Sequence, residues 1–279
     1  MNPELNGYWG TTTSTIDWCE ENYVVSGYAA EFMNTISNAI FVILAVKLLS
    51  SSIRNKHGGI FVIVSIGILL IGIGSWLFHM TLRYEYQLLD ELPMVYFTWI
   101  PFAYLLAVEV ENKSRRILIY AIVLALMIFF TVTYLCFWDN PLLQQVVFGS
   151  LATFIIFRTI TLTNKYVTDQ SYRNFMFRLF FFAMFEIISG FVAWNIDTLL
   201  CSRWIQARRC IGLPLGLLLE WHAWWHVLTG LGVYHFVIFT QCLNMWYNKK
   251  QDLYEVRGFF GTAIPFDIVL KKGLQKKTA

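Results

Sequence analysis

The residues best suited to chemistry are two histidines, His222 and His226, which lie four positions apart in the apolar stretch LLLEWHAWWHVLTGLGVYHF. Residues at i and i+4 lie on one face of a helix, so both imidazoles can direct a nitrogen at one point, as two ligands of a metal ion do. The same pair could instead be two hydrogen-bonded histidines that only pack. Because ionisable side chains are costly at membrane depth, their presence in an apolar stretch favours a functional role.

A third ligand has to come from elsewhere in the chain, which contains five histidines. His57 lies in a polar, basic stretch, and His235 lies beyond His226 by a spacing that places it about 180° round a helix. His79, at the end of the apolar run GSWLFHM, is therefore the predicted third ligand. Three neutral imidazoles with one open position are typical of catalytic zinc, whereas structural zinc usually has four protein ligands and favours thiolates.

Two further polar side chains are expected beside these histidines. Ser75 precedes His79 by four residues and shares its helical face, although a serine in a membrane helix commonly bonds its own i−4 carbonyl. Asp90 stands just before Pro93, and because proline is tolerated in a first helical turn, the next helix is expected to begin there. Asp90 could simply cap that helix. A short connection would instead return its carboxylate to the depth of His79.

The elements that position these residues follow from composition. With 57% hydrophobic and 14% charged residues, the chain is too apolar for a soluble protein, which predicts an all-α polytopic membrane protein. We expect a luminal segment over 1–26, a catalytic bundle over 27–240 and a cytosolic tail over 241–279. Within the bundle, stretches of about 20 apolar residues predict seven transmembrane helices, at residues 27–50, 59–82, 88–108, 116–137, 142–163, 175–196 and 214–240.

Basic residues predict the orientation of this bundle. If the N-terminus is luminal, the segments assigned to the cytosol contain most of the 21 lysines and arginines, as the positive-inside rule requires. The C-terminus is then cytosolic. Three arginines between the sixth and seventh spans run against this trend. The net charge of +3 reflects the cytosolic bias and indicates no nucleic-acid partner.

The N-terminal segment holds oxygen ligands of the kind that calcium prefers, at short spacing. They are Asp17, Glu20, Asn22, Glu31 and a backbone carbonyl near Trp18. A solvated acidic segment has the same composition, and the spacing is not that of an EF-hand. Glu31, however, falls one turn into the first predicted span, where an unpaired carboxylate would be costly. Both interpretations stay open on these residues alone.

Cysteines offer a way to hold this segment in place. The predicted topology places Cys19, Cys201 and Cys210 on the luminal side, where oxidising conditions permit a disulfide. A bond from Cys19 to the loop after the sixth span would fix the acidic segment over the bundle. The spacing does not choose between its two partners.

Several motifs, in order along nearly the whole chain, resemble the alkaline ceramidase family, which is related to the adiponectin-receptor-like proteins. They are WGTTTSTIDWCEENY, SWLFH, LLDELPM, WNID and EWHAWWHVLTGLGVY. The resemblance implies that His79, His222 and His226 bind zinc, and that Ser75 and Asp90 join the catalytic group. It also implies a calcium site at Asp17, Trp18, Glu20, Asn22 and Glu31, and a luminal disulfide from Cys19 to Cys201.

The implied reaction is zinc-dependent hydrolysis of the amide of ceramide, a lipid substrate held within the bilayer. Asp90 would take the proton of the attacking water and later deliver it to the leaving amine, while Ser75 would donate to the developing oxyanion. The alternative is a non-enzymatic receptor-like protein with a structural zinc. Such a protein is expected to have a cytosolic N-terminus, whereas the distribution of basic residues here predicts a luminal one.

The final residues, KKTA, include a dilysine at Lys276 and Lys277. This pattern resembles the KKxx retrieval signal that coat proteins recognise on the cytosolic face of the early secretory pathway. Lysines in a cytosolic tail also bind anionic lipid headgroups without any sorting function. Because the charge pattern independently places the tail in the cytosol, we expect residence in the endoplasmic reticulum membrane, with cycling through the early Golgi.

Overall fold

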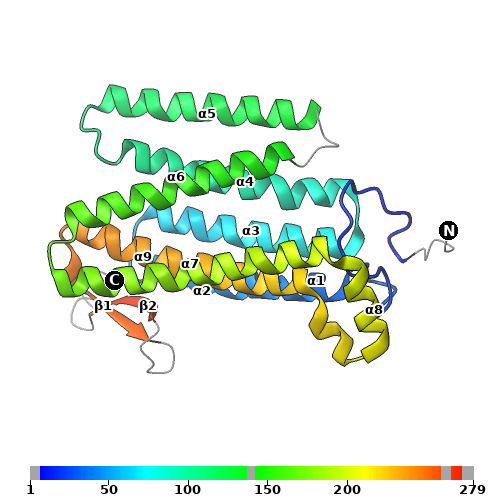
Figure 1. The fold of residues 1–279 in the computed structure, drawn as a ribbon. Helices are drawn as coiled ribbons and strands as arrows, with labels where there is room; N and C mark the ends of the chain where they lie inside the picture. Colours follow the sequence, from blue (N-terminus) through cyan, green and yellow to red (C-terminus); the bar gives the residue numbers. More distant parts are fainter. Residues whose placement is uncertain (1–6, 137–141, 259–264, 272–279) are drawn as a thin grey trace.

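The computed structural model describes residues 7–136, 142–258 and 265–271, and these form a bundle of long helices (Figure 1). In an apolar medium a helix satisfies its own backbone hydrogen bonds, which is why uninterrupted apolar stretches fold this way. The long helices are α2 (Ala39–Arg54), α3 (Gly59–Thr81), α4 (Tyr84–Ala107), α5 (Lys113–Cys136), α6 (Leu142–Tyr166), α7 (Gln170–Leu199) and α9 (Trp221–Tyr247). The short ones are α1 (Phe32–Ser37), α8 (Cys201–Ile211) and the 3-10 turns η1 (Leu215–Leu219) and η2 (Gln251–Leu253).

Six of the described helical segments are long and apolar enough to cross a membrane. They are α1 with α2 as one segment, then α3, α5, α6, α7 and α9. The protein is therefore an all-α, multi-pass membrane protein. Helix α4 is as long as its neighbours, but its first half carries Glu85, Asp90 and Glu91, which lower its hydropathy. A seventh crossing stays a prediction.

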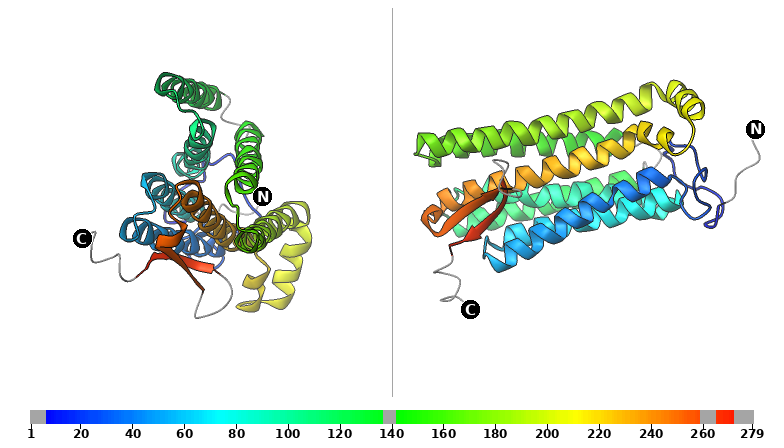
Figure 2. Two further views of the ribbon diagram at one scale, coloured as in Figure 1. Left: turned by 90° about the vertical axis from the view of Figure 1, so that its left-hand side faces the viewer. Right: turned by 90° about the horizontal axis from the view of Figure 1, so that it is seen from below.

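Close packing of α7 on α9 forms the centre of the bundle, with α2 and α3 beside α9. A small residue allows the α7–α9 approach, because a methyl group at Gly232 of α9 would lie 2.9 Å from the Ala183 carbonyl oxygen of α7. Helix α5 lies at the outer edge of the bundle (Figure 2). Its outward side chains, such as Leu118 and Phe129, are apolar and exposed, as a lipid-facing surface requires.

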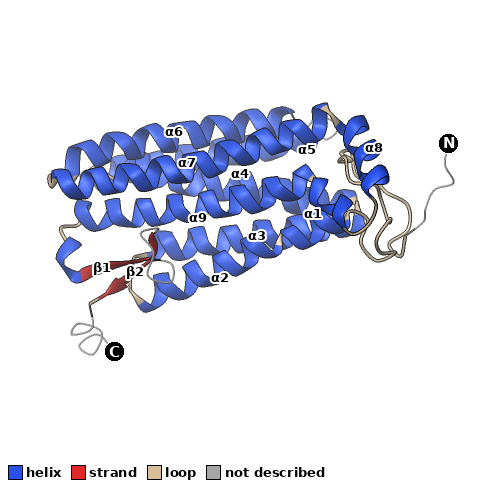
Figure 3. Ribbon diagram, turned by 60° about the horizontal axis from the view of Figure 1, so that its bottom comes forward, coloured by secondary structure: helices blue, strands red, loops and turns tan. Residues whose placement is uncertain are grey.

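The two ends of the bundle are covered by different segments (Figure 3). The N-terminal segment, α8 and η1 cover one end. At the other end, β1 (Tyr254–Gly258) and β2 (Pro265–Leu270) form an antiparallel pair. Asp267 of β2 is anchored to α2, where it accepts a hydrogen bond from Ser51 at 2.5 Å and lies 3.6 Å from the Lys47 ammonium.

Several helix boundaries, and the described part of the tail, differ from the sequence-based expectation. Helix α9 continues to Tyr247, past the expected start of the tail, because Leu243 and Met245 still pack in the core. The described part of that tail is also not a simple extension, since it forms the β1–β2 pair. Helix α4 begins at Tyr84 rather than beside Asp90, so that Pro93 lies inside the helix and not in its first turn.

Candidate metal centre

Three buried histidines meet at the end of the bundle that the N-terminal segment covers. His79 lies in the last turn of α3, and His222 and His226 lie in the first two turns of α9. One ligand atom from each ring falls within 4.8 Å of the others. In the described parts of the chain, no other group of three His, Cys, Asp or Glu side chains meets this criterion. The i, i+4 pair and its expected third partner therefore do converge.

Hydrogen bonds set the tautomers of two of these rings, and so determine which ring nitrogen can bind a metal ion. Nδ1 of His79 contacts the Glu31 carboxylate, which only accepts, so that nitrogen carries the proton and Nε2 has the lone pair. Nδ1 of His226 lies 2.8 Å from Ser37 Oγ, whose own hydrogen is directed at the Asn34 carbonyl oxygen 3.0 Å away. Ser37 therefore accepts from His226, and Nε2 of His226 is also a lone-pair donor.

The third ring, His222, has a buried nitrogen, Nδ1, with no hydrogen-bond partner in the protein. The ring stacks on Trp18 with centroids 4.1 Å apart, and its centroid lies 5.1 Å from that of His79 and 4.6 Å from that of His226. A buried imidazole nitrogen without a partner is costly unless a ligand satisfies it. Three neutral imidazoles with bare nitrogens are a donor set that fits zinc.

Ser75 and Asp90 are brought together as the sequence predicted, by an unusually close contact between α3 and α4. The Ser75 hydroxyl lies close enough to the Asp90 carboxyl to act on its charge. The contact is possible because residue 74 is glycine: a methyl group there would lie 2.2 Å from the Leu89 carbonyl oxygen. That carbonyl is the one whose helical partner would be the N–H of residue 93, which Pro93 lacks. Pro93 and Gly74 thus act together to bring α4 at Asp90 against α3 at Ser75, which lies one helical turn before His79.

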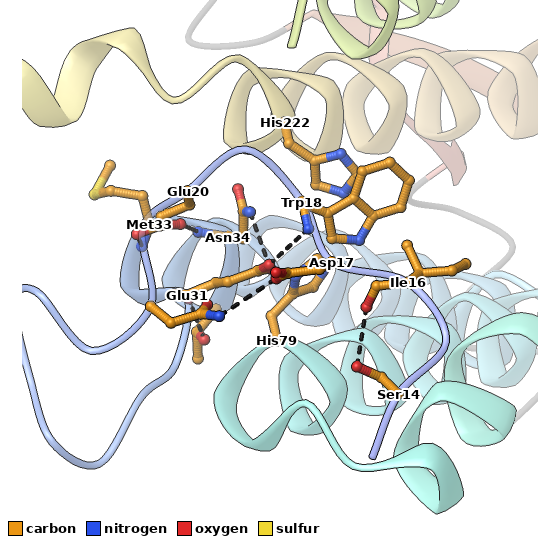
Figure 4. Close-up of polar contacts among 12 residues, drawn as sticks. Ser14, Ile16, Asp17, Trp18, Glu20, Glu31, Met33, Asn34, His79 and His222 are labelled. Carbon is orange, nitrogen blue, oxygen red and sulfur yellow. Dashed lines mark hydrogen bonds and ion pairs between the residues drawn. The ribbon is translucent and has the colours of Figure 1, made fainter. Parts of the chain in front are cut away.

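The segment predicted to bind calcium lies directly against His79 (Figure 4). Glu31 holds one carboxylate oxygen on the His79 ring and accepts a hydrogen bond from the Trp18 backbone N–H on the other, at 3.1 Å. The predicted role of the Trp18 carbonyl as a calcium ligand stays a prediction. Glu31 is thus a partner of a metal-centre histidine as well as a predicted calcium ligand.

The other predicted calcium ligands are close neighbours of this carboxylate. Glu20 accepts hydrogen bonds from the first-turn N–H groups of Met33 and Asn34 in α1, at 2.7 and 2.8 Å. Burial raises the pKa of the Glu20 carboxyl to about 7. Asp17 is exposed and accepts a 3.4 Å hydrogen bond from the Asn22 amide, whose own oxygen is buried without a partner. The Asn22 amide oxygen is therefore a buried acceptor that no described protein group satisfies.

A disulfide joins Cys19 to Cys201 at the start of α8. Of the two candidate partners, Cys201 is thus the one used, and Cys210 is a free, exposed thiol. Asp197, in the last turn of α7, strengthens the same junction: its carboxylate accepts from the backbone N–H groups of Cys19 and His222, both at 3.3 Å. Asp197 therefore positions the first turn of α9, which carries a predicted metal ligand.

Two charged residues that sequence reasoning left without a role also secure this end. The Arg208 guanidinium of α8 pairs with the Glu220 carboxylate at 2.8 Å and donates to the Cys19 carbonyl oxygen at 2.5 Å. Both side chains are buried. Arg208 is one of the arginines that ran against the positive-inside trend, and its buried partner explains its presence. The sequence did contain one signal of this pair: the Glu220 carboxylate lies beside the double-histidine motif in an apolar stretch, where it requires a partner.

Another buried contact joins α9 to α7, where Nδ1 of His235 lies 2.7 Å from the Glu186 carboxylate. It lies two and a half helical turns from His226 along α9, so it is not part of the metal centre. The expectation that His235 is not a zinc ligand agrees with this placement.

Comparison with known proteins identifies the family. A family model described as Ceramidase matches residues 10–266. The chain is 39% identical over 250 residues to alkaline ceramidase YPC1 of Saccharomyces cerevisiae, which covers 86% of this chain and 79% of the yeast protein. It is 38% identical over 252 residues to alkaline ceramidase 3 of Mus musculus, covering 88% and 91% of the two chains. Alkaline ceramidase 1 of Homo sapiens is 26% identical over 260 residues. The chain belongs to the alkaline ceramidase family.

Proposed function

We propose that this protein hydrolyses the amide bond of ceramide to a sphingoid base and a free fatty acid, with zinc held by His79, His222 and His226. One observation carries the proposal: three buried imidazoles meet, two with Nε2 lone pairs available, and Ser75, which lies beside Asp90, is one helical turn from His79. The names of the relatives support the substrate, since each is called an alkaline ceramidase.

Each residue has a role that its contacts support. When bound, zinc would polarise the amide carbonyl and make a water acidic enough to attack it. Asp90 accepts the proton of that water and delivers it to the leaving amine. The Ser75 hydroxyl lies beside the Asp90 carboxylate and can donate a hydrogen bond to it. Once Asp90 is protonated it no longer needs a donor, so the Ser75 hydroxyl can donate a hydrogen bond to the developing oxyanion while keeping its proton.

The surroundings suit a lipid amide. Glu31 and Ser37 hold two of the imidazoles in one tautomer and orientation, which is how neighbouring groups commonly tune a metal site. Apolar helices surround the centre, so the two hydrocarbon chains of a ceramide can stay in an apolar medium while its amide reaches the histidines. We also propose that the chain crosses the membrane seven times, with α4 as the third crossing, and that its N-terminus is luminal.

We also propose that Asp17, Glu20, Asn22 and Glu31, with a backbone carbonyl at Trp18, bind calcium. The buried, unpartnered oxygen of Asn22 beside the Asp17 carboxylate supports this, because both are hard donors that suit calcium. Chelation of calcium should then lower the unfolding temperature of the purified protein, and Asn22→Ala should remove that response. A protein whose unfolding temperature ignores both chelator and calcium has a solvated acidic segment here instead.

The proposed address is the endoplasmic reticulum membrane, with cycling through the early Golgi. Lys276 and Lys277, on which coat-protein recognition would depend, lie outside the described residues. Replacing both lysines by serine should release the protein to later compartments, as imaging would show. Unchanged retention would mean that the retention signal lies elsewhere in the chain.

The activity is tested by incubating the purified protein with a mixed panel of ceramides that differ in sphingoid base and acyl chain, followed by mass spectrometry. The expected result is release of sphingoid base and fatty acid in equal amounts, with none from Asp90→Asn. A protein that binds zinc but leaves every ceramide intact would favour the receptor-like alternative.

A further inference from the structure

A cavity of about 540 Å³, lined by both apolar and polar residues, lies at the end of the bundle opposite the histidines. It is formed where α3 begins and α9 ends, and Tyr254 of β1 also lines it. Figure 3 shows β1 and β2 at this end, away from α8 and the N-terminal segment. Because Gly59 begins the helix that His79 nearly ends, the cavity is roughly 30 Å from the metal centre, at about 1.5 Å per residue. It is thus a separate site.

One wall of the cavity contains a buried histidine that the proposed reaction does not use. His57 is 5% exposed, and its Nε2 lies 2.9 Å from the Ile268 carbonyl oxygen. A carbonyl oxygen only accepts, so Nε2 carries the proton. Burial lowers the pKa of His57, which keeps the ring neutral and leaves Nδ1 with a bare lone pair. Nδ1 is buried and has no partner in the protein, so it requires a donor from a ligand.

The same cavity receives the start of α3. Gly58 and Gly59 line it, and no side chain caps the helix. The first N–H groups of a helix have no partner within the helix and carry a partial positive charge, which favours an anion. Lys56 and Lys250 also line the cavity and add two full positive charges. The cavity therefore has several features that attract an anion. It also has one hydrogen-bond acceptor, Nδ1 of His57, which requires a donor.

Among the described residues, the Asp267 carboxylate of β2 acts electrostatically on His57 and could oppose an anion. Its charge is already compensated, however, by the Ser51 hydroxyl at 2.5 Å, the Ile268 backbone N–H at 2.9 Å and the Lys47 ammonium at 3.6 Å. Asp267 is not among the residues that line the cavity. The residues that line the cavity include two lysines and no carboxylate.

We propose that this cavity binds a phosphate group that has a hydroxyl group beside it, on either a phospholipid headgroup or a soluble phosphorylated polyol. The start of α3, Lys56 and Lys250 hold the phosphate, and Nδ1 of His57 accepts a hydrogen bond from the hydroxyl. The end of a membrane-spanning bundle is where phospholipid headgroups lie, and a soluble phosphate can reach the same place from water. Bound there, the group would tie α3 to α9.

The test uses the purified full chain and measures its unfolding temperature by tryptophan fluorescence, independently of ceramide turnover. In one arm, inositol 1-phosphate or inorganic phosphate is titrated in detergent, against chloride at equal ionic strength. In the other arm, nanodiscs of phosphatidylcholine are compared with nanodiscs that also contain phosphatidylinositol. The test variant is Lys56→Ala/Lys250→Ala. The matched control, Lys113→Ala/Arg115→Ala, removes two exposed charges from the same end without touching the cavity.

Saturable stabilisation by inositol 1-phosphate indicates a soluble ligand, and stabilisation only by phosphatidylinositol indicates a lipid; either supports the proposal. In both cases the lysine variant should bind at least about tenfold more weakly, while the control variant should bind like the unmodified chain. The absence of stabilisation in both arms, or equal loss in the control, would overturn the proposal. Inorganic phosphate binding as tightly as inositol 1-phosphate would overturn the role of His57 and thus the proposed ligand class.

Discussion

Ser37 Oγ lies 2.8 Å from Nδ1 of His226, and the Ser37 hydroxyl hydrogen is directed at the Asn34 carbonyl oxygen. A single turn of α1 therefore sets the tautomer of a histidine in α9. Groups that orient metal-bound histidines in this way commonly contribute about 10- to 100-fold to metal affinity. Ser37→Ala should weaken zinc binding by that order, as measured by competition with a chelator. Ser37→Thr keeps the hydroxyl and should retain affinity; equal loss in both variants would show that packing, not the hydrogen bond, matters.

Asp90→Asn separates proton transfer from metal binding. Asn has the shape of Asp but cannot carry the proton, so ceramide turnover should fall by about 10²- to 10⁴-fold. Zinc content should be unchanged, because the three imidazoles are untouched. Turnover close to that of the unmodified protein would show that another residue is the general acid and base.

The approach of α3 to α4 should be sensitive to one methyl group. A Cβ at Gly74 would lie 2.2 Å from the Leu89 carbonyl oxygen, so Gly74→Ala must push the two helices apart. Such overpacking costs about 1–3 kcal/mol, and it should also separate Ser75 from Asp90 and reduce turnover. Gly149→Ala in α6 is the matched control, since nothing lies within 4 Å of the added methyl. Equal unfolding temperatures for the two variants would contradict this account.

The stability of the end of the bundle that α8 covers should depend on Arg208 and not on Arg209. Arg208 is buried against Glu220, whereas the Arg209 side chain is 69% exposed. Removing one partner of a buried ion pair typically destabilises by about 3–5 kcal/mol, so Arg208→Ala should clearly lower the unfolding temperature. Arg209→Ala, which breaks only an exposed pair with Glu21, should change it little. A reversed order would mean that the surface pair holds this end together.

The sequence predicted best what local spacing determines. His222 and His226 share a helical face whatever surrounds them, and a short connection between two helices brings Asp90 back towards His79. What depends on distant partners could not be predicted. Arg208 interacts with the Cys19 carbonyl oxygen far away in sequence, and its helix looked like a charged loop.

The C-terminal strands were missed for a related reason. Asp267 finds its partners, Ser51 and Lys47, on α2, so nothing local in the expected cytosolic tail indicated that this segment packs on the bundle. The start of α4 was misplaced because Pro93 was taken as a first-turn proline. Its missing N–H is tolerated in the helix interior, where the Leu89 carbonyl oxygen faces Gly74 instead.

The central claim is that zinc at His79, His222 and His226 is required for ceramide hydrolysis. The most direct measurement removes metal from the purified protein with a chelator, then follows ceramide turnover as zinc is added back in known amounts. We predict that turnover is lost on removal and returns in proportion to bound zinc, reaching its maximum at one zinc per chain, with no recovery in His226→Ala. Full turnover by protein shown to contain no zinc would contradict the account.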